Sequence, residues 1–210
     1  MPSPAKTTKR RGRRQGEPVS RDAVLAAAKQ RFATEGYEKT TLRAIAHDAH
    51  VDPSMVLYLF GSKEELFRES LRLIIDPEVL VAALTGDEDP DIGTRMVRTY
   101  LGIWETPDTA ASMRAMLQSA TSNTDANEAF RGFMQNYVLT AVSSVLGGGE
   151  QARLRAMLAA STLVGTAMLR YIIEVPPLAA LAADEVVRLI APTVTRYLTA
   201  DAAELGLPQL

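Results

Sequence analysis

Side chains that could perform covalent or metal chemistry are scarce in this sequence. The chain has no cysteine, which excludes disulfides and thiolate metal sites, and it has two histidines. His47 and His50 lie three residues apart with no third ligand close by, so we interpret them as surface or groove-facing side chains. Carboxylates could serve a helical-bundle enzyme as general acids and bases, but no pair is singled out. We therefore expect no metal and no cofactor.

The basic residues indicate a different chemistry, the binding of phosphate groups. Residues 1–70 contain 13 Lys and Arg against 9 Asp and Glu, whereas residues 71–210 contain 10 against 16. A cationic head on an anionic body is typical of a modular nucleic-acid binder. Residues 1–18 have no periodic apolar positions, so we expect a disordered basic arm that either lies along DNA phosphates or stays solvated. Its charges are Lys6, Lys9, Arg10, Arg11, Arg13 and Arg14.

Four short helices are predicted in the first third of the chain, and they would position any phosphate-binding groups. Apolar residues recur at spacings of three and four before Gly36, which ends the first helix. The second helix spans residues 41–49 and the third spans residues 52–60, with Asp52 as its N-cap. Ser62 caps a fourth. Two short helices joined by a tight turn indicate a helix-turn-helix, whose second helix lies in the major groove of DNA.

The residues of these helices form a motif over about residues 20–67. It consists of Ala27-Ala28, Phe32, Gly36-Tyr37, Thr40-Thr41-Leu42-Arg43, Ile45-Ala46, Ala49, Val51, Phe60 and Ser62-Lys63-Glu64-Glu65-Leu66. The motif has no gap, and it resembles the DNA-binding domain of the tetracycline-repressor (TetR/AcrR) family. The resemblance implies a ligand-responsive transcriptional repressor and not an enzyme. Such a repressor binds a palindromic operator as a dimer and leaves it when a small apolar or aromatic effector binds.

The resemblance also implies particular contacts with DNA. In the family, a threonine pair at the start of the second helix and a lysine at the start of the fourth contact phosphate. Thr40, Thr41 and Lys63 match these positions. Arg43, one turn into the second helix, could reach a phosphate or a base edge. The third helix would present Pro53, Ser54, Met55, Leu57 and Tyr58 to the groove.

The predicted recognition helix departs from the family pattern. Leu57 stands where the family has a phosphate-binding tyrosine, and Tyr58 points about 100° away around the helix axis. The groove-facing positions also contain no Arg, Asn or Gln for bidentate contacts with bases. We therefore expect readout through thymine methyl groups, the Tyr58 hydroxyl and DNA shape.

The rest of the chain is also predicted to be helical, because its apolar residues follow a helical period and no segment alternates with period two. The fold is expected to be all-α, with about nine helices. A three-helix helix-turn-helix domain would occupy residues 19–66, and a ligand-binding and dimerisation domain residues 67–210. The main helices of the second domain are predicted over residues 92–105, 110–120, 127–146 and 150–174, with a last helix capped by Asp184.

Large, flexible side chains accumulate in the predicted second domain. Methionines adapt to irregular cavities, and the family resemblance implies an effector cavity among these helices. An ordinary filled core would have a similar composition, and a constitutive DNA-binding protein would differ only in lacking the cavity. Candidates for a polar anchor are Arg95, Arg98, Arg114, Arg131 and Glu174. The predicted lining consists of Met96, Tyr100, Trp104, Met113, Met116, Phe130, Phe133, Met134, Tyr137, Met168 and Tyr171.

Small residues in the long helix at 150–174 would let another helix approach closely, and an apolar stripe follows the last helix. The family resemblance implies a four-helix dimer interface built from these two helices. We expect it to bury on the order of 1,500 Å² or more. The predicted interface residues are Leu158, Ser161, Gly165, Val187, Ile190, Val194 and Leu198.

Segments that would direct the chain to a membrane are not found. No apolar run reaches the roughly 18 residues that span a bilayer, and the basic N-terminus lacks the apolar stretch of a signal peptide. We expect a cytoplasmic protein with no membrane contact, whose partners are double-stranded DNA, a small-molecule effector and a second copy of the chain.

Overall fold

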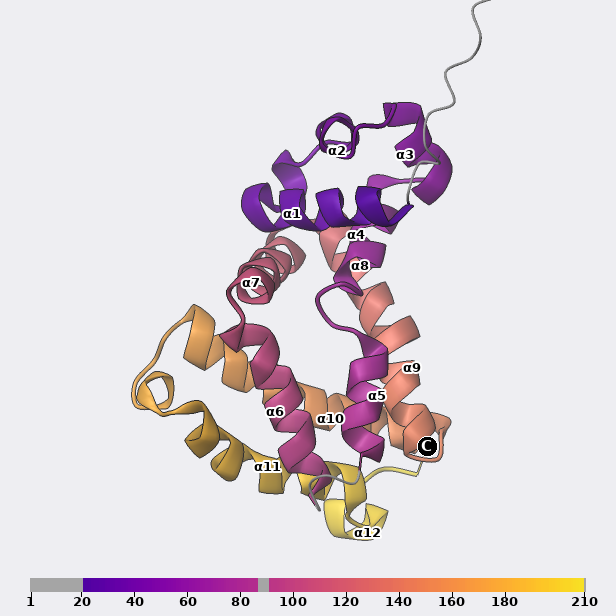
Figure 1. Cartoon of the computed structure of the whole chain (residues 1–210). Coiled ribbons are helices and arrows are strands. Elements are labelled where there is room, and N and C mark those ends of the chain that lie inside the picture. Colours follow the sequence, from indigo (N-terminus) through magenta and orange to yellow (C-terminus); the bar gives the residue numbers. More distant parts are fainter. Residues whose placement is uncertain (1–20, 87–90, 210) are drawn as a thin grey trace, which may run out of the picture.

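The computed structural model describes residues 21–86 and 91–209, and Figure 1 shows their helices. The predicted all-α fold is confirmed, since these ranges contain no strand. The predicted basic arm at 1–18 lies outside them. Among the described residues, no helix is both long enough and apolar enough to cross a bilayer.

The α-helices are α1 (Arg21–Lys39), α2 (Leu42–Asp48), α3 (Pro53–Phe60), α4 (Lys63–Leu71), α5 (Pro77–Thr85), α6 (Ile92–Glu105), α7 (Pro107–Ser122), α8 (Thr124–Phe133), α9 (Leu139–Val145), α10 (Gly149–Ala167), α11 (Ala183–Thr199) and α12 (Ala202–Leu205).

The predicted caps Asp52 and Ser62 begin α3 and α4, and Thr41 caps α2 at the residue where this helix is predicted to begin. The side-chain oxygens of Thr41, Asp52 and Ser62 each accept a hydrogen bond from a backbone N–H in the first turn of α2, α3 or α4, over 2.8 to 3.1 Å. Gly36 has a φ of 76°, which interrupts α1 at the predicted end before the helix resumes as far as Lys39. These local signals fix where each helix begins.

The longer helices agree with the sequence in position and differ in continuity. α6 has the predicted bounds, whereas the helix predicted over residues 127–146 is divided into α8, a π-helical turn at Met134–Val138 and α9. α10 likewise continues into a π-helical turn at Met168–Ile172. The described residues therefore form more helical segments than the nine expected. The spacing of apolar residues does not reveal where a continuous helix changes from α-helical to π-helical geometry.

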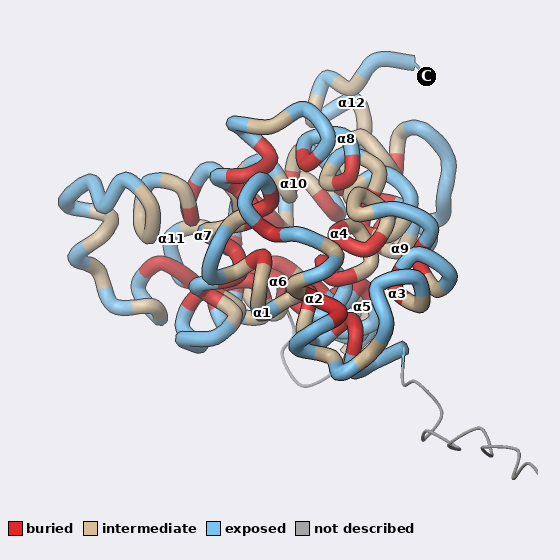
Figure 2. Tube along the Cα trace, turned by 90° about the horizontal axis from the view of Figure 1, so that it is seen from above, coloured by how far each residue is buried: buried red, intermediate tan, exposed pale blue. Residues whose placement is uncertain are grey.

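The N-terminal helices rest on the body of the molecule through α1 and α4. Figure 1 shows α2 and α3 at the outer end, α7 and α8 beneath α1 and α4, and the remaining helices below these. Phe67 of α4 makes edge contacts with Phe32 and Tyr37 of α1, with ring centroids 4.9 and 5.1 Å apart. The buried apolar residues, from Val24 to Leu198, form one continuous core. Figure 2 shows the buried stretches of the chain in red. The position of the N-terminal helices therefore depends on α7 and α8.

Candidate nucleic-acid interface and internal cavity

The recognition-helix candidate α3 has one buried face and one open face. Val56 and Phe60 are buried in the core, as their spacing predicts. On the other side, the Tyr58 side chain is 83% exposed and Leu57 is 48% exposed. Pro53 and Ser54 are also exposed, while Met55 is half-buried. The positions that the sequence assigns to the groove therefore lie together on the outer face of α3.

The first turn of α3 is held by a compact cap. Asp52 accepts hydrogen bonds from the backbone N–H of Ser54 at 2.8 Å and from the Ser54 hydroxyl at 2.6 Å. These hydrogen bonds lower the pKa of Asp52, so the cap is ionised at neutral pH. The hydroxyl proton of Ser54 is thus engaged in the cap, and this side chain can offer DNA only its lone pairs.

The start of α2 separates the two threonines that the family resemblance groups together. Thr41 is exposed and caps α2. The Thr40 side chain is 1% exposed, and its hydroxyl donates to the Gly36 carbonyl oxygen at 2.7 Å. This corrects the expectation that Thr40 meets phosphate, because its hydroxyl stabilises the kink in α1 instead. Arg43 remains exposed on α2.

The two histidines lie on the surface of α2 and the turn after it. His47 and His50 are both exposed, and the His47 ring lies 3.3 Å from Asp48. Within residues 21–86 and 91–209, no cluster of three or more histidine or carboxylate side chains is arranged to hold a metal ion.

Lys63, at the start of α4, folds back onto α1. Its ammonium lies 4.3 Å above the ring of Tyr37 and donates to the Glu38 carbonyl oxygen at 3.4 Å. Partial burial lowers the pKa of Lys63, against the raising effect of nearby Asp125 and Glu38. The lysine predicted to hold phosphate is therefore engaged within the protein in this state.

A guanidinium that sequence reasoning missed ties α2 to α1. Arg31 donates to both carboxylate oxygens of Asp48, at 2.5 and 2.9 Å, and to Glu35 at 2.5 Å. The bond from Arg31 lowers the pKa of Asp48 to about 2, so the pair stays intact at neutral pH. Seventeen residues separate Arg31 and Asp48, and no local spacing rule links such a pair.

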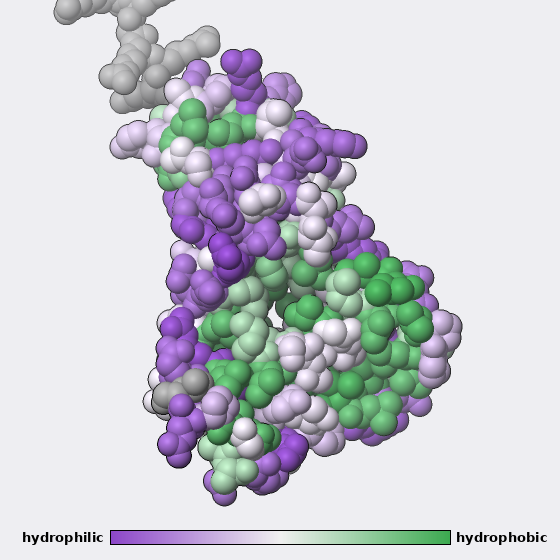
Figure 3. Space-filling view, turned by 180° about the vertical axis from the view of Figure 1, so that it is seen from behind, coloured by the Kyte–Doolittle hydropathy of each residue, from purple (hydrophilic) through white to green (hydrophobic). Residues whose placement is uncertain are grey.

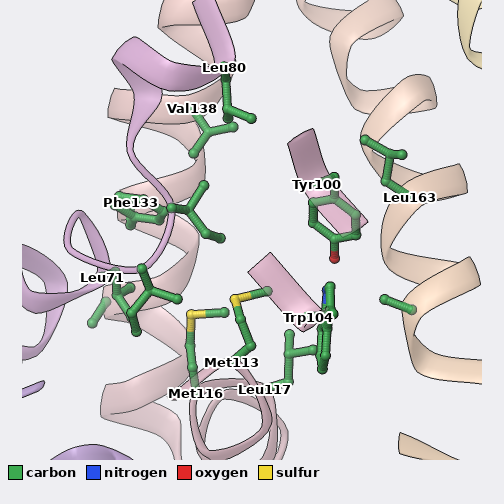
Figure 4. Packing of buried hydrophobic residues seen from close by; sticks show 14 of the residues in the cluster. Leu71, Leu80, Tyr100, Trp104, Met113, Met116, Leu117, Phe133, Val138 and Leu163 are labelled. Carbon is green, nitrogen blue, oxygen red and sulfur yellow. The ribbon is translucent and has the colours of Figure 1, made fainter. Parts of the chain in front are cut away.

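The body of the molecule contains an apolar cavity of about 60 Å³, lined by α5 to α11 and the turns between them. Figure 4 shows Met113, Met116 and Leu117 of α7 on one side of the packed residues and Tyr100 on the other. Six predicted lining residues, Met96, Tyr100, Met113, Met116, Phe130 and Met134, are present in the wall. The wall is completed by Ile75, Leu80, Leu117, Val138, Leu139, Val142, Ala156, Ala159, Ala160, Leu163, Val164 and Leu198.

The other five predicted lining residues lie outside the cavity wall. Trp104 and Tyr171 stack on each other, with centroids 5.2 Å apart and planes 2° from parallel. Phe133 stacks on Tyr137, which lies under the guanidinium of Arg72. Met168 belongs to the π-helical turn and is half-buried. The charged candidates for an anchor, Arg95, Arg98, Arg114, Arg131 and Glu174, are also absent from this wall.

One face of α10 and α11 is open to solvent. Met157, Ser161, Gly165 and Leu169 recur every four residues on α10 and its π-helical continuation, and all four are exposed. Leu189 on the neighbouring α11 is 63% exposed. Ile173 and Val175, which follow the π-helical turn after α10, are exposed as well. Figure 3 shows apolar side chains gathered on the flank of the body at the right of the view.

The apolar stripe predicted to pair α11 with a second chain is used within the single chain. Val187, Val194 and Leu198 are 4%, 0% and 5% exposed, so they belong to the protomer's own core. Ile190 and Leu158 are half-buried beside this core. The prediction that Val187, Val194 and Leu198 form a dimer interface is therefore corrected, because they belong to the core. Ser161 and Gly165 remain on the open face.

α7 connects the cavity to the N-terminal helices. It contributes Met113, Met116 and Leu117 to the cavity wall, and its next residues reach α1. The Ser119 hydroxyl accepts a hydrogen bond from the buried backbone N–H of Tyr37 at 3.1 Å, directly after the Gly36 kink. A displacement of α7 by a molecule in the cavity would act on this hydrogen bond.

Comparisons with known proteins agree with this arrangement. Residues 24–70 match the family described as bacterial regulatory proteins, tetR family, and residues 90–198 match the tetracyclin repressor-like C-terminal domain. A search of curated protein sequences finds no match. A TetR-family regulator from Streptomyces coelicolor A3 is 35% identical, with 89% of this chain and 98% of that chain covered and a TM-score of 0.63.

Solved structures with lower identity share the fold. NalD of Pseudomonas aeruginosa, described as the secondary repressor of a multidrug efflux pump, is 19% identical, with 86% of this chain and 95% of that chain covered and a TM-score of 0.57. SmeT, solved in complex with triclosan, is 20% identical, with 83% and 88% covered and a TM-score of 0.57. The family matches, together with the exposed helix α3, show that this chain belongs to the tetR family and is a DNA-binding transcriptional regulator.

Proposed function

We propose that the chain is a repressor that binds a palindromic operator as a homodimer and leaves it when a small, mainly apolar effector enters the cavity. The observation that carries the proposal is the course of α7, which joins the cavity wall to the helices that bear the open face of α3. A helical-bundle enzyme, the alternative left open by the sequence, is excluded because the tetR family consists of regulators and not of enzymes.

The DNA-binding part of the proposal is tested with random DNA. Fragments retained by the full chain at low ionic strength should converge on an inverted repeat, whose half-sites lie about one helical turn apart, or a multiple of it, in a twofold dimer. Failure to retard any duplex, or selection of sites without twofold symmetry, would contradict the proposal.

For DNA contact we propose Thr41, Arg43 and the outer face of α3, with Lys63 released from Tyr37 toward phosphate. Since the outer face of α3 carries no charged side chain, phosphate contacts from α2 and α4 would position it, and apolar contacts would read the bases. Of the two large exposed apolar residues on α3, Tyr58 is the more exposed, at 83% against 48% for Leu57.

Replacing Tyr58 with alanine is expected to weaken binding to the selected operator about tenfold, the loss of one good base contact. The melting temperature should not change, because the side chain contributes little to the core. Gel retardation and thermal melts measure the two effects. Tyr58→Phe is the matched control that separates the hydroxyl from the ring, and an operator affinity of Tyr58→Ala equal to wild type would remove Tyr58 from the interface.

For the coupling between cavity and DNA we propose the hydrogen bond from Tyr37 to Ser119. Ser119→Ala leaves the buried Tyr37 N–H without an acceptor, which should cost about 1–3 kcal/mol of stability. The N-terminal helices would then adopt more than one orientation, so operator affinity should fall several-fold. Urea unfolding and gel retardation measure these effects, and hydrogen exchange of the Tyr37 amide should become faster.

Ser112→Ala is the matched control on the same helix. Ser112 is also buried, but its hydroxyl donates to the Asp108 carbonyl oxygen, within α7. Operator affinity should therefore be that of the wild type in this variant. If both serine variants change operator affinity equally, the hydrogen bond from Tyr37 has no special part in coupling.

A further inference from the structure

Two buried polar atoms lie without a partner beside the apolar cavity. The Tyr100 hydroxyl and the Trp104 indole N–H make no hydrogen bond within the described residues, although the two side chains are only 6% and 4% exposed. Figure 4 shows the Tyr100 hydroxyl directed toward the Trp104 ring, one helical turn along α6. A buried donor without an acceptor destabilises the fold, so the Tyr100 hydroxyl calls for an acceptor that the protein does not supply.

Two other buried polar atoms of the described residues also lack a partner, but they belong to a different type of side chain. They are the Nε atoms of Arg68 and Arg170. Both belong to guanidinium groups in which another nitrogen is paired, in Arg68 with Glu65 and in Arg170 with the carbonyl oxygens of Leu178 and Leu181. For Tyr100 and Trp104, by contrast, the unpartnered atom is the one polar atom of the side chain.

The indole is held in its orientation from behind. Its ring stacks on Tyr171, and the Tyr171 hydroxyl donates to Glu105 at 2.6 Å. Burial raises the pKa of Tyr100 to about 12, so this hydroxyl keeps its proton at neutral pH. An indole nitrogen can only donate. The Trp104 N–H faces the Tyr100 oxygen from behind the wall. The Tyr100 O–H is therefore the donor that remains free, in a wall that is otherwise aliphatic, aromatic or thioether.

We infer that the effector is a small neutral molecule with an apolar body and one hydrogen-bond acceptor oxygen, which accepts a hydrogen bond from the Tyr100 hydroxyl, with Trp104 behind it. The inference rests on the proposed function, because it concerns the cavity assigned to the effector. A charged ligand is disfavoured, since no lining residue carries a charge to pair with it. The acceptor oxygen would be that of a carbonyl, an ether or a hydroxyl group.

The cavity must widen to take a ring-sized ligand. It encloses about 60 Å³, whereas an apolar cavity of about 150 Å³ accommodates benzene. Four methionines, Met96, Met113, Met116 and Met134, form the adaptable part of the wall. Because two of them stand on α7, occupation of the cavity would move the helix that bears Ser119.

Cyclohexanone and methylenecyclohexane form a matched pair of probes, because they differ only in the exchange of a carbonyl oxygen for a methylene group. Each is titrated into the full chain without DNA, by calorimetry and by the shift in melting temperature. The quantity compared is the ratio of the two affinities. Tyr100→Phe removes one oxygen atom and leaves the shape of the wall, so the fold should persist. The affinity for cyclohexanone, divided by that for methylenecyclohexane, should fall about tenfold in this variant.

Tyr137→Phe is the matched control, since it removes a tyrosine hydroxyl on a residue outside the cavity wall and should leave the affinity ratio unchanged. Fluorescence of Trp104, the chain's single tryptophan, should change with cyclohexanone and not with methylenecyclohexane. An unchanged ratio in Tyr100→Phe would overturn the inference while leaving the cavity as an effector site. Binding of neither probe would overturn the inference as well, whereas operator retardation tests DNA binding independently.

Discussion

Replacing Gly93 with alanine is expected to destabilise the protein by about 3 kcal/mol, through overpacking between α6 and α11. A Cβ atom at this position would lie 2.7 Å from the backbone nitrogen of Thr195 and closer still to the Ala191 carbonyl oxygen and the Thr195 hydroxyl. Two of these neighbours are backbone atoms, so no rotamer change can make room. The Gly93 N–H also donates to Asp91 at 3.1 Å and to Thr195 at 3.2 Å. The melting temperature should therefore fall by roughly 6–12 °C in a thermal scan.

Gly102→Ala provides the control within the same helix. Gly102 is exposed, and a Cβ there would meet no atom within 4 Å. Since alanine favours helix over glycine, this variant should be more stable than the wild type by up to about 1 kcal/mol. Equal melting temperatures for Gly93→Ala and the wild type would show that α6 and α11 do not approach as closely as described.

The local signals of this sequence determined much of the fold. Asp52 and Ser62 cap the helices at which they were expected, and Thr41 caps α2 at its predicted first residue, because capping depends on a side chain and the next three residues. The exposed face of α3 followed from the burial of Val56 and Phe60 by the same reasoning. Gly93 carried no such signal, because its role depends on Thr195, about 100 residues later in the chain.

The predictions that were wrong concern which part of the protein, or which partner, a side chain contacts. Val187 and Val194 form a stripe on α11 that has the same helical period whether it faces the protomer's own core or a second chain. The cavity wall shows the same ambiguity, since Trp104 was predicted as lining and lies behind Tyr100, whereas Ala159 was overlooked. Thr40 was assigned through the family motif, but the Gly36 carbonyl oxygen beside it takes its hydroxyl.

Gly165→Arg is expected to convert the proposed dimer to monomers and to weaken operator binding at least 100-fold. Gly165 lies in the exposed α10 stripe between Ser161 and Leu169, and no atom lies within 4 Å of a Cβ built on it. The arginine therefore fits the single chain without strain. In a twofold interface the stripe would meet its own copy, so two bulky charges would be buried against each other. A 100-fold change corresponds to about 2.7 kcal/mol, which is less than the expected cost of two unpaired buried charges.

Val79→Arg is the matched control for Gly165→Arg. Val79 is an exposed apolar residue on α5, outside the α10–α11 face, so the same charge placed there should leave both the dimer and operator binding intact. Analytical ultracentrifugation measures the association, and thermal melts of both variants establish that the chain remains folded. A Gly165→Arg protein that stays dimeric would assign the contact between copies to another surface. If it became monomeric yet bound the operator with wild-type affinity, a single α3 helix would suffice for recognition, and the twofold operator would lose its physical basis.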